Sequence, residues 1–230
     1  MENKDVTLYY WKIRGLGAPV ATLLEYLNVP YNYHQYSDPE SWKNDKQKLI
    51  EGGFLNPNLP YIEEKSSGLK LSETFAVLFH LAAKHNSDLT PKTSDEFRDV
   101  LVVKGIITDY NSGITGTTYR CSSTEELIKT LGSTMKYHSS KTNYFKMTLS
   151  KQTWVLGDKL SFLDFYLAEL LEKLVTMQDE LKTEFVDADT LKVFQDYVNR
   201  FTALETVKKY RESDRFVKRP FNNVPKASWG

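Results

Sequence analysis

The first residues that could take part in chemistry lie in the segment Tyr-Trp-Lys-Ile-Arg-Gly-Leu, which runs from Tyr10 to Leu16. A phenol with a pKa near ~10 stays protonated at neutral pH and can donate a hydrogen bond to an anion. Aimed at a thiol, whose pKa is near ~8.5 when free, it would stabilise the thiolate. Tyr9 is a rival donor, but strand alternation sends it to the opposite face. The structural alternative is a core tyrosine.

Two later segments could bind a ligand through main-chain groups. Asn58-Leu59-Pro60-Tyr61 places a proline before a strand, and a cis X-Pro bond there would turn the neighbouring N–H and C=O outward. Glu73 and Thr74 open a helix, where free N–H groups and the positive end of the helix dipole attract anions. The alternatives are a trans proline that opens a strand and an ordinary helix cap.

In this order and spacing the three segments resemble the N-terminal half of glutathione transferases, and Tyr-Trp-x-Ile-Arg-Gly-Leu is most similar to the mu class. The resemblance implies an enzyme in which Tyr10 stabilises the thiolate of glutathione for attack on apolar electrophiles. Three departures from the mu pattern make the assignment to the mu class less specific. The segment before Trp42 is too short for the mu loop, the stretch 50–57 is longer, and Glu-Thr replaces the usual Gln-Ser.

The resemblance also implies how glutathione, the co-substrate, is held. The backbone of Leu59 would pair with the cysteinyl part, Glu73 and Thr74 would bind the γ-glutamyl carboxylate, and Asp109 would reach the γ-glutamyl amine across a homodimer. Trp42 and Lys46 are four residues apart and would share one helical face toward the glycyl carboxylate. A solvated lysine beside a half-buried tryptophan is the alternative. The implied glutathione-binding residues are Trp11, Trp42, Lys46, Asn58, Leu59, Pro60, Glu73, Thr74 and Asp109.

For the second substrate, the resemblance makes Tyr119 a catalytic residue that acts as general acid. Gly113 and Gly116 lie between Asp109 and Tyr119, and each glycine weakens a helix by about 1 kcal/mol. The position of Tyr119 therefore depends on whether the helix continues through them. The expected acceptor pocket is apolar and is formed by Ile13, Leu16, Tyr119 and Phe221.

The elements that would position these residues change character along the chain. β-branched and aromatic residues favour strands, and a 3.6-residue apolar repeat favours helices. The face containing Phe75, Leu78, Phe79 and Ala82 should be buried, and the polar stretch 41–54 should hold a short helix and a loop. The expected strands are 6–11, 31–36, 60–64 and 69–72, with helices over 18–27 and after 73.

Beyond residue 85 the strand patterns end. Thr93 with Glu96 and Ser161 with Asp164 form capping boxes, and Leu167, Leu170, Leu171 and Leu174 repeat at helical spacing. We therefore expect an α/β thioredoxin-like N-terminal domain over 1–85, a polar linker over 86–92 and an all-α C-terminal domain over 93–230. This is the glutathione transferase fold.

Composition narrows the function classes further. Lys plus Arg and Asp plus Glu number 30 each, so the net charge offers no field for nucleic acid. The four histidines show no ligand spacing with each other or with Cys121, the one cysteine, so we expect no metal and no internal disulfide. The chain lacks a membrane-length apolar segment, and we expect a cytoplasmic detoxification enzyme. A carrier or structural protein of the same fold and a glutathione-dependent isomerase remain open.

Overall fold

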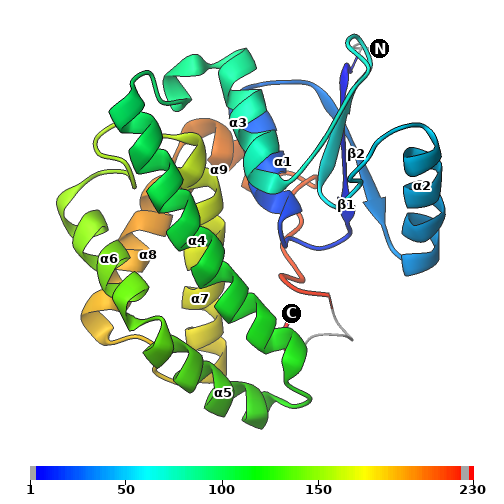
Figure 1. Cartoon of the computed structure of the whole chain (residues 1–230). Coiled ribbons are helices and arrows are strands. Elements are labelled where there is room, and N and C mark those ends of the chain that lie inside the picture. Colours follow the sequence, from blue (N-terminus) through cyan, green and yellow to red (C-terminus); the bar gives the residue numbers. More distant parts are fainter. Residues whose placement is uncertain (1–3, 224–227) are drawn as a thin grey trace.

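The computed structural model describes residues 4–223 and 228–230 and has an N-terminal α/β part and a C-terminal helical part (Figure 1). The predicted domain 1–85 therefore begins before the first described residue, and the predicted domain 93–230 includes residues 224–227, which lie outside the described residues. The α/β part contains β1 (Val6–Trp11), α1 (Gly17–Tyr26), β2 (Tyr31–Tyr36), α2 (Pro39–Glu51), β3 (Tyr61–Glu64), β4 (Leu69–Ser72) and α3 (Thr74–His85). A short 3₁₀ turn, η1 (Ser87–Leu89), lies in the predicted linker.

The sheet has the strand order β2-β1-β3-β4. β1 is parallel to β2, with Val6 opposite Tyr31, and antiparallel to β3, with Tyr9 opposite Tyr61. Helices α1 and α3 cover one face, and α2 lies on the other side (Figure 1). The expected strands are confirmed, and β2 is an edge strand.

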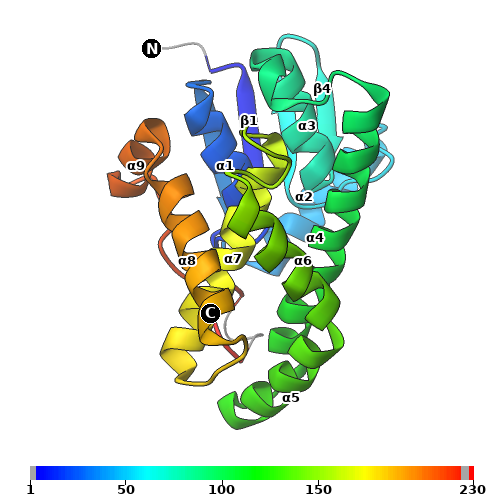
Figure 2. The same cartoon turned by 90° about the vertical axis from the view of Figure 1, so that its left-hand side faces the viewer.

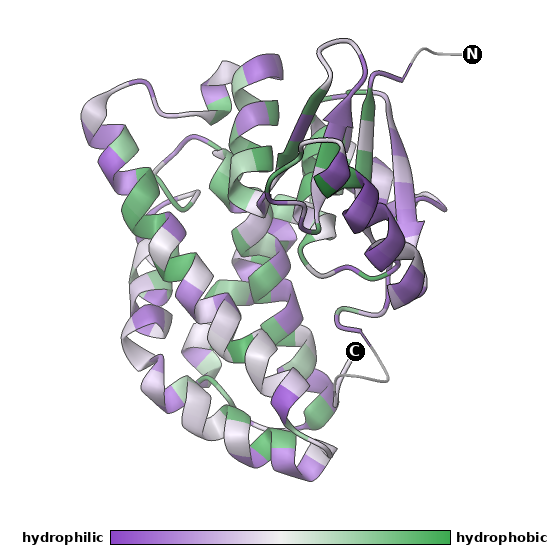
Figure 3. Ribbon diagram, turned by 45° about the vertical axis from the view of Figure 1, so that its right-hand side comes forward, coloured by the Kyte–Doolittle hydropathy of each residue, from purple (hydrophilic) through white to green (hydrophobic). Residues whose placement is uncertain are grey.

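Helix α2 is longer than expected for the stretch 41–54. It begins at Pro39, because Asp38 caps it by accepting a hydrogen bond from the Ser41 N–H at 2.8 Å. None of its residues is buried, and Figure 3 colours it largely hydrophilic. The sequence pattern missed its length because a helix without a buried face has little apolar periodicity.

The helical part contains α4 (Ser94–Arg120), α5 (Thr124–Tyr137), α6 (Ser139–Lys151), α7 (Phe162–Leu181), α8 (Ala188–Thr202) and α9 (Glu205–Glu212). Helix α7 lies in its middle (Figure 2) and buries the predicted leucine repeat. Both predicted capping boxes are confirmed. No helix among the described residues is both long and apolar enough to cross a membrane.

Helix α4 continues without a break through Gly113 and Gly116, so Tyr119 lies on the same helix as Asp109. The inner face of α4 is buried at Tyr110, Ile114 and Thr117, and this packing outweighs the low helix propensity of glycine. At Gly113 the reason for glycine is local, because a Cβ there would collide with the buried His138 ring.

The buried face of α3 is rotated from the predicted one. The predicted Leu78 and Ala82 are fully buried, together with Val77 and Leu81, whereas Phe75 and Phe79 are half-buried. These two phenylalanines pack across the junction of the two parts, Phe75 on Tyr166 and Phe79 on Phe162. The periodicity therefore marked residues that contact a second layer.

The C-terminal segment, residues 213–223 and 228–230, returns from α9 to the loop after β1. The N–H groups of Arg14 and Gly15 donate to the carbonyls of Pro220 and Phe221 at 2.8 and 3.0 Å. Ser228 N–H donates to the Thr118 carbonyl at 2.8 Å. The segment therefore joins the end of the first strand to the C-terminal end of α4.

Candidate active site

Tyr10 ends β1 with its ring buried and 6% exposed. Its hydroxyl oxygen accepts a hydrogen bond from the Leu16 N–H at 2.8 Å, and the hydroxyl proton stays available to a second group. Burial raises the pKa of Tyr10 above its ordinary value near 10, and the charges of Tyr119 and Glu169 add to this while the Leu16 N–H opposes it. The phenol is therefore neutral at physiological pH and can act as a donor.

The loop around Tyr10 has two glycines that its ring requires. Gly15 has a φ of +40°, and a Cβ there would meet the Tyr10 hydroxyl. A Cβ at Gly17 would meet the Tyr10 ring itself. The close approach of this backbone is what brings the Leu16 N–H to the phenolic oxygen.

Tyr9 has a different environment, as strand alternation predicts. Its ring stacks on Tyr61 at 4.3 Å, and its hydroxyl donates to Glu63 at 3.3 Å. The two tyrosines thus have separate partners.

A second apolar cluster gathers several of the predicted site residues. Tyr10, Ile13 and Leu59 are buried in it together with Tyr36 and Tyr61. The predicted residues that pack against it half-buried are Trp11, Leu16 and Trp42. The Leu59–Pro60 peptide is cis. Because Leu59 and Tyr10 share this cluster, the turn before β3 lies next to the end of β1.

The other predicted glutathione contacts lie at the rim of this region or outside it. The Asn58 side chain accepts from the Leu59 N–H at 3.0 Å. Glu73 is exposed and has a φ of +73°, Thr74 is buried, and Glu73 makes no side-chain cap to α3. The first N–H groups of α3 thus receive no cap from it. Lys46 lies on α2 one turn after Trp42, and its side chain is exposed.

Asp109 and Tyr119 are both on α4 but in different surroundings. Asp109 is exposed, 3.7 Å from the Lys141 amine. Tyr119 is 40% exposed, and its hydroxyl accepts from the Asn223 N–H at 2.8 Å. Tyr119 is close enough to Tyr10 to raise the pKa of Tyr10, whereas the partner that the structure gives Asp109 is Lys141.

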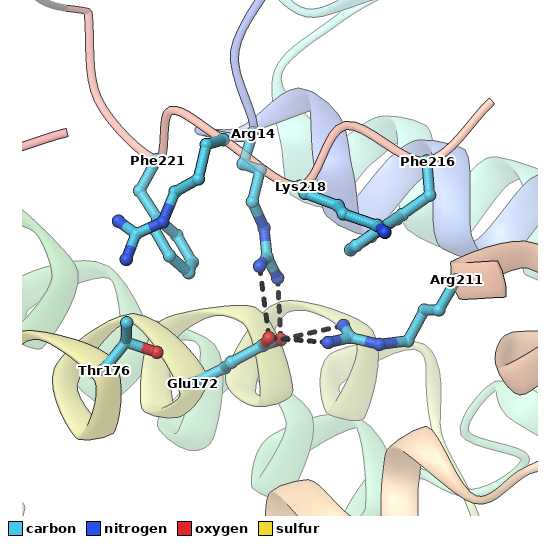
Figure 4. A pocket seen from close by; sticks show the side chains of 8 residues that line it. Arg14, Glu172, Thr176, Arg211, Phe216, Lys218 and Phe221 are labelled. Carbon is cyan, nitrogen blue, oxygen red and sulfur yellow. Dashed lines mark hydrogen bonds and ion pairs between the residues drawn. The ribbon is translucent and has the colours of Figure 1, made fainter. Parts of the chain in front are cut away.

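Phe221 lies apart from the other residues predicted for the acceptor pocket. It is buried, stacks on Trp229 at 5.4 Å and lies 4.1 Å from the guanidinium carbon of Arg14. It borders a cavity of about 300 Å³ with Arg14, Glu172 and Arg211 (Figure 4). Ile13, Leu16 and Tyr119 do not line this cavity, and their shared pocket remains a prediction.

The sequence reasoning missed the buried ionic network that holds the Tyr10 loop. Arg14, 3% exposed, donates to both Glu169 and Glu172 of α7 at 2.6 to 3.1 Å. Glu172 also accepts from Arg211 (Figure 4). The sequence feature that could have indicated this network is a pair of glutamates three residues apart in a leucine-rich helix.

Comparison with known proteins identifies the family to which this fold belongs. Residues 6–83 match the family "Glutathione S-transferase, N-terminal domain" and residues 116–214 match "Glutathione S-transferase, C-terminal domain". Glutathione S-transferase 2 of Gallus gallus is 31% identical, covering 94% of this chain and 93% of its own length. Glutathione S-transferase Mu 5 of Mus musculus is 30% identical, covering 100% and 98%. The crystal structure of the glutathione S-transferase Blo t 8 superposes with a TM-score of 0.77 at 25% identity, covering 97% and 99%.

The two-part fold is therefore that of the glutathione S-transferases. The chain belongs to the glutathione S-transferase family and is a divergent, mu-like member. The expectation of a transferase enzyme is confirmed at this level.

Proposed function

We propose that the protein is a glutathione transferase that adds the thiolate of glutathione to apolar electrophiles. The main support is the Tyr10 hydroxyl, which is neutral, positioned by the Leu16 N–H and located beside the Leu59–Pro60 turn. A preorganised donor of this kind stabilises an anion without reorganising during the reaction.

In the proposed reaction the thiol loses its proton to solvent, and the Tyr10 O–H donates to the sulfur anion. The sulfur then forms a bond to the electrophilic carbon, and either a leaving group departs or a conjugated carbonyl takes up the electron pair. Tyr119 would supply a proton to the developing oxyanion, and its location near Tyr10 supports this role.

Glutathione would be held by main-chain groups on both sides of Tyr10. The turn at Leu59 offers its backbone to the cysteinyl part, in the manner of an added strand. The start of α3 at Glu73 and Thr74 offers N–H groups to the γ-glutamyl carboxylate. Trp42 would support the glycyl end, and Lys46 is free to swing toward its carboxylate from the exposed face of α2.

The test compares Tyr10→Phe with Tyr9→Phe in conjugation of glutathione to a chloronitrobenzene. We expect Tyr10→Phe to retain binding to immobilised glutathione and to lose about 10²–10³ in kcat, the usual effect of removing one anion donor. Its bound thiol should also titrate near the free value. Tyr9→Phe should resemble the wild type. Loss of activity in Tyr9→Phe alone would reverse the assignment, and unretained wild-type protein would favour a carrier.

We also propose a cytoplasmic, detoxifying homodimer. Large apolar side chains stay on the surface of the single chain, among them Leu55 at 95% and Leu101 at 65% exposure, and a partner could cover them. Asp109 is exposed on α4, the helix that carries Leu101. Sedimentation should give a dimer at micromolar concentration, and Asp109→Asn should weaken glutathione binding while leaving the dimer intact. A monomer would refute the proposal.

A further inference from the structure

A groove of about 930 Å³ separates the edge strand β2 from the C-terminal segment. One wall is formed by Tyr31, Asn32, Tyr33 and Gln35 of β2, and the other wall by residues 214–220. In the sheet β2 and β3 flank β1 on opposite sides, and the lining of the groove includes none of the residues proposed to hold glutathione. The groove is therefore separate from the proposed glutathione site.

The β2 wall of the groove presents unpaired main-chain groups. In the ladder the Lys12 N–H donates to the Tyr36 carbonyl at 2.9 Å, so the even-numbered residues of β2 point their N–H and C=O toward β1. Tyr31, Tyr33 and Gln35 consequently point theirs outward. Outside the strand ladders, no backbone hydrogen bond among the described residues involves Tyr33 or Gln35. The buried Nε2 of Gln35 also has no partner in the described part of the chain.

The charges around the groove are mostly positive. Its lining contains one carboxylate, Asp214, and five cationic side chains: Lys4, Lys12, Arg215, Lys218 and Arg219. Glu25 neutralises Arg215 at 2.7 Å, and Glu180 pairs with Arg219. Within residues 4–223 and 228–230, neither Lys12 nor Lys218 belongs to an ion pair of the structure. A chain with balanced charges thus places two cations without an ion pair among the described residues around one groove.

We propose that this groove is a docking site for an acidic, extended peptide segment of a partner protein, which adds as a strand to the free edge of β2. The outward N–H and C=O groups of Tyr33 and Gln35 would bond to its main chain. Lys12 and Lys218 would pair with its acidic side chains. The six residues of β2 extend about 17–20 Å, which matches a segment of about six residues.

The unpaired strand edge distinguishes a peptide from other anions. A nucleic acid or a lipid headgroup could pair with the lysines, but neither carries the alternating N–H and C=O groups that a strand edge recognises. A smaller cavity beside the groove shares Phe216 and Lys218 with it, and the arginine that this cavity adds, Arg211, is already paired with Glu172 (Figure 4).

Fluorescence anisotropy with a labelled hexapeptide of alternating glutamate and valine tests the proposal on the full-length protein. We expect saturable binding of one peptide per chain that weakens at least about tenfold between about 0.05 and about 0.5 M NaCl. Two control peptides separate charge from backbone recognition. One has glutamine for glutamate, and the other keeps the charges but is N-methylated at alternate residues. Each should bind at least about tenfold more weakly than the parent peptide.

A double charge reversal, Lys12→Glu with Lys218→Glu, should weaken binding of the parent peptide by at least about tenfold. The matched control is Lys129→Glu with Lys136→Glu on α5, at the far end of the helical part (Figure 1), and it should bind as the wild type does. Circular dichroism melting of both variants checks that they fold. Since both pairs make the same change in net charge, a difference between them locates the site.

Three results would overturn the proposal. The first is equal binding of the parent and N-methylated peptides, which would show that the surface recognises charge and not the peptide main chain. The second is equal binding by the two double variants. The third is a single-stranded oligonucleotide or an anionic vesicle that binds through Lys12 and Lys218 more tightly than the peptide.

Discussion

Replacing Arg14 with methionine would test how much the buried ionic network stabilises the fold. The guanidinium makes four hydrogen bonds, two to Glu169 at 2.6 and 3.0 Å and two to Glu172 at 2.7 and 3.1 Å. Without it Glu172 keeps Arg211, at 2.7 and 2.9 Å. Glu169, however, loses both of its bonds while only 11% of its side chain is exposed.

The expected cost of Arg14→Met is about 3–5 kcal/mol in the free energy of unfolding, the usual effect of leaving a buried charge without its partner. Burial already raises the pKa of Glu169, and Arg14 opposes that rise. In the variant the pKa should rise further, and the folded state then binds a proton that the unfolded chain releases near pH ~4.3. Stability of the variant relative to wild type should therefore fall as the pH rises from about 5 to about 8.

Urea unfolding at one fixed protein concentration measures this cost. Adding Glu169→Gln to Arg14→Met removes the unpaired charge, so the double variant should recover more than about 1 kcal/mol and lose most of the excess pH dependence. Arg14→Lys is the conservative control that keeps a charge. A loss below about 1 kcal/mol in Arg14→Met, or no recovery in the double variant, would refute the reasoning.

Two further perturbations follow from the helices. Gly113→Ala should destabilise the protein in thermal melting, because its Cβ would overlap the buried His138 ring; Gly132→Ala on α5, where space is open, should stabilise it by about 0.5–1 kcal/mol. Equal effects of the two would contradict the collision. Lys173 is buried, and burial lowers its pKa to about 8, whereas the unfolded side chain titrates near ~10.4. Between these values the unfolded chain binds the extra proton, so wild-type stability relative to Lys173→Met should rise with pH by at most about 1.4 kcal/mol per unit. A flat difference between pH 8 and 10 would show that Lys173 titrates normally.

Local elements and the family motif could be predicted from the sequence alone. The strands over 6–11 and 31–36 and the two capping boxes depend on neighbouring residues, so their signals are complete within a few positions. The order of the Tyr10, Pro60 and Glu73 segments indicates the family from local motifs alone. The full length of helix α2 could not be predicted, because an exposed helix has no apolar face to produce a periodic pattern.

Charge and composition describe the chain as a whole and cannot show where charges gather. The balance of 30 acidic and 30 basic residues argued against a field for anions, yet Lys12 and Lys218 lie 206 positions apart in the chain and border one groove. Only folding brings such residues to the same groove, because the C-terminal segment returns to the first strand.

The arrangement of the site was likewise decided by the tertiary structure. The donor to the Tyr10 oxygen is the Leu16 N–H, a group that every residue except proline carries and that no sequence pattern can mark. Arg14 meets Glu169 across 155 positions, and Asn223 meets Tyr119 across 104. The sequence by itself determined which side chains are available for chemistry and which helices and strands form. The packing of α7 and the C-terminal segment against the loop after β1 decided the distances between these side chains, their burial and their protonation. Contacts between distant parts of the chain form only when the tertiary structure forms.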